Sequence, residues 1–148
     1  MHRLFVAFAA STFALPVFAG GHLTASGDAE AGEKAFRQCV SCHVVVDDAG
    51  ETLAGKKAKT GPNLYGIIGN NFGQVEGFKY SKINQAAAGM TDLVVDEATM
   101  VAYLADPTKF LQGATGEGGR SKMTYKVRKE EDAINLYAFL SSLQGAPE

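Results

Sequence analysis

The chain has 148 residues, a length that fits one domain, and its 14 basic and 16 acidic side chains give a formal net charge of −2. This balance excludes a typical nucleic-acid-binding domain, which would show a clear basic excess. Tryptophan is absent and glycine is frequent, with 17 residues, so many turns are expected.

The N-terminal segment has the plan of a secretory signal peptide. Arg3 supplies a positive end, an apolar stretch runs from Leu4 to Phe18, and a small-residue cleavage pattern ends at Ala19. A membrane anchor is the alternative, but the stretch is short and Pro16 interrupts it. We therefore predict that residues 1–19 are cleaved and that the product is exported, to the periplasm if the source is a Gram-negative bacterium.

The remaining sequence predicts a loose N-terminal tail at residues 20–27, followed by one domain at residues 28–148. A first helix should begin near Asp28, whose carboxylate can cap it, and continue towards His43. Lysines and glycines make residues 47–61 a solvated loop, and the turn residues in the following "TGPNLYGIIGNNFG" favour irregular structure.

Two short helices are expected in the middle of the chain. The first is capped by Ser81 and stopped at Gly89, and the second is capped near Asp96 and ended by Pro107. A glycine-rich loop, "GATGEGGRSKMTY", should follow them.

The segment "KEEDAINLYAFLSSLQG" predicts a last helix, with acidic residues in its first turn and an apolar stripe of Ile134, Tyr137, Phe139 and Leu140. No strand-length alternation is evident, so the fold class is all-α, with four to five short helices joined by long loops. So few short helices bury little apolar surface, and a disulfide, a metal or a large cofactor should complete the core.

The segment "CVSCH" holds both cysteines and the only histidine beyond the first two dozen residues. A zinc site lacks ligands, because His2 lies in the signal segment and His22 in the tail. A thioredoxin-like redox pair would start a helix after a strand, whereas this pair lies near a helix end. A disulfide between Cys39 and Cys42 would remove little chain entropy and would leave His43 unexplained.

Covalent haem attachment explains all three residues, because C-x-x-C-H is the attachment sequence of c-type haem. Cys39 and Cys42 can each add to one vinyl group of the porphyrin, and His43 can then bind the iron. An exported protein would lose a dissociating haem, so covalent attachment suits it, and the porphyrin supplies the missing apolar core. We therefore predict one covalent haem c, with His43 as an axial ligand.

The sixth iron ligand decides between electron transfer and ligand chemistry. No usable histidine remains, so a methionine is the candidate. Met123 lies in a loop that can wrap the ring and is the best choice. Met90, just after a helix-ending glycine, is the weaker alternative, and Met100 lies within a helix, where core packing is the more common role.

The sequence resembles class I cytochromes c, specifically the soluble, long-loop kind of proteobacteria that is close to the mitochondrial protein. The likeness covers roughly residues 28–143 and rests on "CVSCH", "TGPNLYGIIG", "GFKYS", "MVAYLADPTKF" and "SKMTYKV", in that order. It implies a small cytochrome c fold wrapped around one covalent haem, with His43 and Met123 as axial ligands. It also implies that the first and last helices cross, with Gly32 allowing close approach of Ile134 or Tyr137.

The resemblance further implies roles for three residues around the haem. The Pro62 carbonyl would accept the second imidazole N–H, Tyr80 would bond a haem propionate, and Tyr103 would point its hydroxyl at the methionine sulfur. Asn70 stands where related proteins often have a propionate-facing arginine, and a common tryptophan is missing. The loop that carries Met123 is also extended.

A soluble one-electron carrier, not an enzyme, is therefore expected. The resemblance implies a quinol-oxidising cytochrome complex as donor and a photosynthetic reaction centre or terminal oxidase as acceptor. A monomer is expected to dock on acidic surfaces of these complexes through a basic face that includes Arg120, Lys122 and Lys126. The alternative is a haem protein with an open sixth site, which would bind gases or act as a peroxidase.

Overall fold

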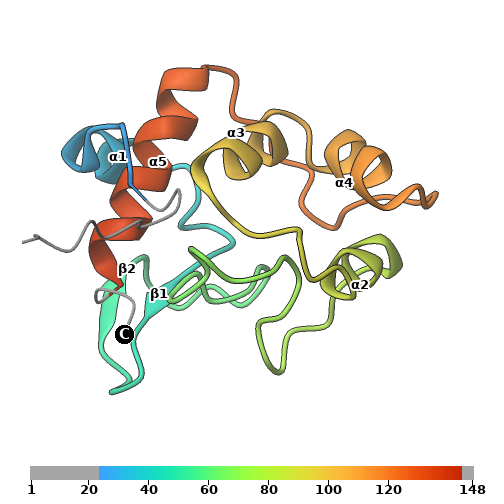
Figure 1. Cartoon of the computed structure of the whole chain (residues 1–148). Coiled ribbons are helices and arrows are strands. Elements are labelled where there is room, and N and C mark those ends of the chain that lie inside the picture. Colours follow the sequence, from blue (N-terminus) through green and yellow to red (C-terminus); the bar gives the residue numbers. More distant parts are fainter. Residues whose placement is uncertain (1–23, 145–148) are drawn as a thin grey trace, which may run out of the picture.

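The computed structural model describes residues 24–144, so the predicted signal peptide and cleavage site lie outside the described residues (Figure 1). The described chain forms five helices and one short hairpin, which confirms a mainly helical small domain. These elements are α1 (Ala29–Phe36), β1 (Val45–Val46), β2 (Thr52–Ala54), α2 (Lys82–Ala88), α3 (Glu97–Ala105), α4 (Pro107–Thr115) and α5 (Glu130–Leu143).

Helices α1 and α5 cross in close contact at one side of the molecule, with α3 and α4 leading away from them (Figure 1). A methyl group on Gly32 would stand 2.7 Å from Cβ of Phe139 and 2.6 Å from the carbonyl carbon of Asn135. The glycine therefore opens the crossing to Asn135 and Phe139 and not, as predicted, to Ile134 or Tyr137. The rings of Phe36 and Phe139 pack beside it, with centroids 5.4 Å apart.

Helix α1 begins where the sequence predicts but ends earlier. The carboxylate of Asp28 accepts from the backbone N–H groups of Glu30 and Ala31, which confirms the predicted cap. Regular helix stops at Phe36, because the N–H groups of Gln38 and Cys39 donate to carbonyls three residues back. The C-x-x-C-H segment consequently lies in tight turns after the helix.

The predicted helices α2 and α3 are present, and a further helix follows them. Asp96 caps α3 through a capping box, whereas the Ser81 hydroxyl donates to Asn84 at 2.7 Å instead of capping α2. Pro107 does not simply end α3, because Asp106 caps a new helix whose first residue is Pro107. A proline fits this position, since the first helical N–H needs no intrahelical acceptor.

A small antiparallel hairpin was not predicted. Strand β1 directly precedes the predicted loop of residues 47–61 and pairs with β2 inside it, and the strands are only two and three residues long. Alternation of apolar and polar residues cannot be detected over so short a length.

The described part of the N-terminal tail contacts the domain. The backbone N–H and the hydroxyl of Ser26 donate to the Glu97 carboxylate at 2.7 and 2.6 Å, and Ala25 packs against the core. The N–H of Asp28 donates to the side chain of Asn135 at 2.8 Å. Residues 25–28 therefore lie against α3 and α5.

The buried apolar side chains form one cluster contributed by all the helices and by β1. Tyr137, Ile83, Leu111 and Val45 are its largest fully buried apolar side chains apart from a proline. Within residues 24–144, no helix combines the length and the apolar character that a membrane crossing requires.

Candidate functional site

A largely apolar cavity of about 300 Å³ lies between the C-x-x-C-H segment and the loop before α5. Its apolar walls come from α1, from residues 64–72 and from α3 and α5, and include Phe36, Leu64, Ile67, Phe72, Leu104, Leu136 and Leu140. Cys39, Cys42, His43, Tyr80, Tyr103 and Met123 also line it. Pro62 lines the cavity as well, so all seven predicted site residues meet there.

Backbone hydrogen bonds fix the C-x-x-C-H turn and attach it to the next loop. The N–H groups of Cys42 and His43 both donate to the carbonyl of Cys39, at 3.0 and 2.9 Å. The N–H of Gly61 donates to the Cys42 carbonyl at 2.7 Å, which places residues 60–62 beside the imidazole. The side chain of Asn63 bonds both backbone groups of Val46 and anchors that loop further on.

The imidazole of His43 is held in a defined orientation. Its Nδ1 lies 2.9 Å from the Pro62 carbonyl oxygen, and because a carbonyl only accepts, Nδ1 carries the proton. A methyl group on Gly61 would lie within 2.8 Å of three imidazole atoms, so only a glycine leaves room for the ring. Burial lowers the pKa of His43, opposed by the Pro62 hydrogen bond, and the neutral ring can offer Nε2 to a metal.

The two cysteines are not joined by a disulfide. Burial raises the pKa of the Cys39 thiol to about 11, with a further contribution from the neighbouring Cys42. A thiol with so high a pKa is protonated at neutral pH, which is unlike the reactive thiolate of a redox pair. Both side chains are only partly exposed and face the same cavity as His43.

Two methionines line the cavity. Met100 is buried, with 6% of its surface exposed, and belongs to the helix-packed core. Met123 is half-buried and lies in the irregular segment between α4 and α5. Met90 is not among the lining residues, and its carbonyl accepts from the Asn71 side chain at 3.0 Å.

The segment that carries Met123 is bonded once to α4 and once to α3, and it is braced by one hydrogen bond of its own. The N–H of Ser121 donates to the Thr108 hydroxyl at 3.2 Å, and the Ser121 hydroxyl accepts from the N–H of Met123 at 3.2 Å. Further on, the N–H of Val127 donates to the Leu104 carbonyl at 2.9 Å. Met123 is therefore positioned by its own backbone and by a buried serine.

A buried polar group lies beside Met123. Ser121 and Asn84 are the buried polar residues of the described chain, 5% and 6% exposed, and both line the cavity. Burial raises the pKa of Tyr103, while hydrogen bonding of its hydroxyl to Ser121 and Asn84 opposes that rise. Tyr103 thus contacts the serine that holds Met123, and its predicted contact with the methionine sulfur stays a prediction.

Tyr80 also lines the cavity and lies in the loop before α2. Its hydroxyl accepts from the N–H of Val75 at 3.3 Å, and burial raises its pKa. Asn70 is exposed and does not line the cavity, and its side-chain amide donates to the Gly66 carbonyl at 2.5 Å. Propionate bonding by Tyr80 stays a prediction.

The three basic residues expected at the docking face differ in their surroundings. The ammonium group of Lys126 pairs with Asp106 at 2.6 Å. Lys122 donates to the Lys79 carbonyl and lies 5.6 Å from the centre of the Phe78 ring. Arg120 is exposed and forms no ion pair within residues 24–144.

Sequence reasoning missed a contact across the cavity mouth. The hydroxyl of Tyr125 donates to the side-chain oxygen of Gln38, the residue directly before Cys39. The two residues are 87 positions apart, so no local pattern could indicate that they meet.

The cavity fits a haem by the chemistry of its lining. The side chains of Cys39 and Cys42 line it, a neutral imidazole has one nitrogen fixed by Pro62 and the other free, and Met123 lines it from the segment before α5. The remaining walls are mostly apolar, as a porphyrin requires. Gly61 leaves space for the imidazole that a side chain would fill.

The chain is similar to several bacterial proteins, although no protein-family model matches it. It is 56% identical over 119 residues to "Cytochrome c2" of Rhodovulum adriaticum, covering 80% of this chain and 94% of the relative. It is 37% identical over 147 residues to "Cytochrome c-550" of Paracoccus denitrificans, covering 98% and 88%.

Solved structures of cytochromes c2 are also similar to this chain. Cytochrome c2 from Rhodobacter sphaeroides superposes with a TM-score of 0.77 at 49% identity, and the match covers 82% of this chain and 100% of the solved chain. Cytochrome c2 from Paracoccus denitrificans superposes with a TM-score of 0.73 at 37% identity, covering 80% and 97%.

Proposed function

The chain belongs to the class I c-type cytochromes of the cytochrome c2 and c-550 kind and carries one covalent haem c, and we propose that it is a soluble periplasmic electron carrier with His43 and Met123 as axial ligands. The observation that carries this proposal is the meeting of Cys39, Cys42, His43 and Met123 in one apolar cavity.

The haem supplies a one-electron couple between ferric and ferrous iron. Cys39 and Cys42 would hold the porphyrin through thioether bonds, and the Pro62 carbonyl keeps His43 in the tautomer that can ligate through Nε2. Met123 offers a soft thioether, which favours the ferrous state relative to a nitrogen ligand. Because His43 and Met123 would both bind the metal, the protein would leave no position there for a substrate.

The signal-peptide pattern of residues 1–19 supports export, and covalent attachment suits a protein outside the cytoplasm. We propose that the donor is a quinol-oxidising cytochrome complex and that the acceptor is a photosynthetic reaction centre or a terminal oxidase. A basic face of Arg120, Lys122 and Lys126 would steer docking on acidic surfaces of these complexes. Such carrier complexes are small and short-lived, so charge acts mainly on the rate of association.

The test is a spectroscopic redox titration combined with stopped-flow mixing. We expect one reversible one-electron transition per haem, and reduction by a quinol-oxidising membrane complex in a second-order reaction. Turnover of hydrogen peroxide by the purified protein, or carbon monoxide binding to its reduced form at neutral pH, would favour the alternative of an open sixth site.

A further inference from the structure

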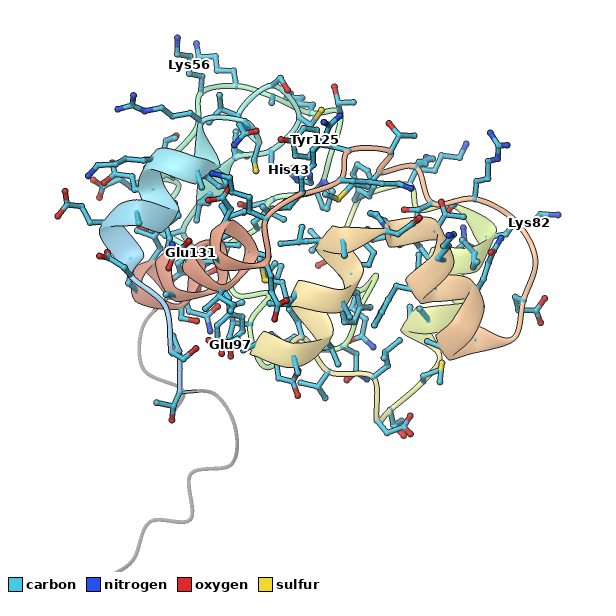
Figure 2. All side chains as sticks on the ribbon, turned by 90° about the horizontal axis from the view of Figure 1, so that it is seen from above. His43, Lys56, Lys82, Glu97, Tyr125 and Glu131 are labelled. Atoms are coloured by element: carbon cyan, nitrogen blue, oxygen red, sulfur yellow. The ribbon has the colours of Figure 1, made fainter. Side chains whose placement is uncertain are left out.

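The side chain of Tyr125 has an unusual position for an aromatic residue. It is 42% exposed and is, with Leu53, one of two exposed large hydrophobic side chains in residues 24–144. Yet it also lines the cavity, together with His43, and the two residues lie close to each other in Figure 2. Tyr125 therefore lies at the mouth of the cavity, where its hydroxyl can bond to another residue of the lining segments.

The hydroxyl of Tyr125 donates to the side chain of Gln38. Gln38 directly precedes Cys39, and Tyr125 follows Met123 by two residues. The hydrogen bond therefore joins the segment that attaches the haem to the segment that carries the proposed methionine ligand.

The other contacts of the Met123 segment all run elsewhere. Ser121 and Val127 bond to Thr108 and Leu104, which belong to α4 and α3, and Lys122 reaches the loop before α2. Among described residues, the Tyr125–Gln38 bond is the only hydrogen bond from residues 120–129 to residues 37–43. On the side of the C-x-x-C-H turn, this hydrogen bond is therefore the link between the two segments that line the cavity.

We propose that Tyr125 and Gln38 form a clasp that positions Met123 by holding its segment closed over the haem. The inference rests on the proposed His/Met ligation. For the methionine to leave the iron, residues 123–125 must move outward, and that motion breaks the clasp. A neutral hydrogen bond of ordinary strength, lost on opening, slows methionine release about two- to tenfold.

The test measures methionine release in the ferric holoprotein at neutral pH. Imidazole at saturating concentration captures the open state, so loss of the methionine-to-iron charge-transfer band reports the release rate by stopped flow. Tyr125→Phe removes only the hydroxyl and should raise this rate about two- to tenfold, and Gln38→Leu should match it. The double variant should be no faster than either single variant, because both remove one bond.

Tyr65→Phe is the matched control, since the Tyr65 hydroxyl makes no hydrogen bond within residues 24–144 and the residue lies outside the Met123 segment. Its release rate should equal that of the parent. Unchanged rates in Tyr125→Phe, or single effects that multiply in the double variant, would overturn the clasp. So would a lower midpoint of guanidinium unfolding with an unchanged release rate, which marks a purely structural contact.

Failure of the underlying ligation has a different signature. If the ferric parent lacks the charge-transfer band, His/Met ligation is wrong and the clasp has no ligand to position. If the band is present and both single variants release methionine at the parent rate, the ligation stands and the clasp alone is wrong.

Discussion

Nδ1 of His43 lies 2.9 Å from the Pro62 carbonyl oxygen, and the same loop presses Gly61 against the imidazole. One backbone segment thus sets both the tautomer and the position of the ring. The N–H of Gly61 is itself bonded to the Cys42 carbonyl at 2.7 Å, so the loop and the C-x-x-C-H turn form one unit. The orientation of the proposed iron ligand depends on a residue that cannot carry a side chain.

Gly61→Ala should therefore disturb the haem site. The added methyl group would lie within 2.8 Å of three imidazole atoms, so the ring or the loop must shift. We expect the holoprotein to lose about 1–3 kcal/mol of unfolding free energy in guanidinium, as overpacking typically costs.

Gly113→Ala is the control for this change. A methyl group on Gly113, within α4, would meet no atom within 4 Å. Alanine is the better helix former by about 1 kcal/mol, so stability should stay constant or rise. If both glycine variants lose the same stability, close packing of Gly61 on His43 is not the cause.

Gly32→Ala should be more damaging, because the clash is with backbone atoms. The new methyl group would stand 2.6 Å from the carbonyl carbon of Asn135, and α1 could only relieve this by moving away from α5. We expect a loss of at least about 3 kcal/mol by denaturant unfolding. A variant with parental stability would show that the helices do not cross at this position.

Protonation of Asp106 should weaken the domain in acid. A hydrogen bond from Lys126 and one from the N–H of Lys109 lower the pKa of this carboxyl. The depressed folded-state pKa adds stability above the unfolded-state value of about 3.9, and this stability is lost as pH falls through the lower folded-state pKa. The loss should be small, as for other exposed pairs.

Asp106→Asn isolates this effect, since asparagine can still cap α4 but cannot pair with Lys126. Thermal unfolding of both proteins should be followed from pH 6 to pH 2. The parent should lose more stability than the variant over this range. Parallel curves would mean that the Asp106–Lys126 pair contributes nothing to the pH dependence.

Charge reversal tests the docking face. Arg120 is exposed without an ion pair in the described chain, whereas Lys126 is paired and Lys122 is bonded to the Lys79 carbonyl. Arg120→Glu should thus change charge without breaking a structural contact. We expect slower second-order electron transfer to an acidic partner complex, with a smaller decrease in rate on adding salt.

Lys56→Glu serves as the comparison for Arg120→Glu. Lys56 is exposed and lies just after β2, outside the segment that carries Arg120, Lys122 and Lys126. Its reversal should alter the rate less. Equal effects of the two reversals, or parental rates that rise with salt, would place the docking face elsewhere.

The sequence predicts the helices with strong local signals and misses elements that depend on distant partners. Asp28 and Asp96 cap their helices as expected, because capping needs only neighbouring residues. Pro107 was interpreted as the end of a helix, although proline also favours a first helical position, and α4 begins there. The hairpin of β1 and β2 is too short to show periodicity.

Some residues of the candidate site can likewise be predicted from the sequence, and others cannot. Cys39, Cys42 and His43 are recognisable because the attachment chemistry requires fixed spacing, and Met123 because it lies in a suitable loop. The pairing of Gln38 with Tyr125 and the contact of Gly32 with Asn135 join residues from opposite ends of the domain. Such contacts are set by tertiary packing, so no local pattern contains them.

The most direct test of the central claim is the choice between the two methionines that line the cavity. Ferric spectra and carbon monoxide binding should be compared for the parent, Met123→Ala and Met100→Leu. The account predicts the charge-transfer band and no carbon monoxide binding in the parent and in Met100→Leu, and loss of the band with carbon monoxide binding in Met123→Ala. Loss of the band in Met100→Leu alone, or a high-spin parent that binds carbon monoxide, would contradict it.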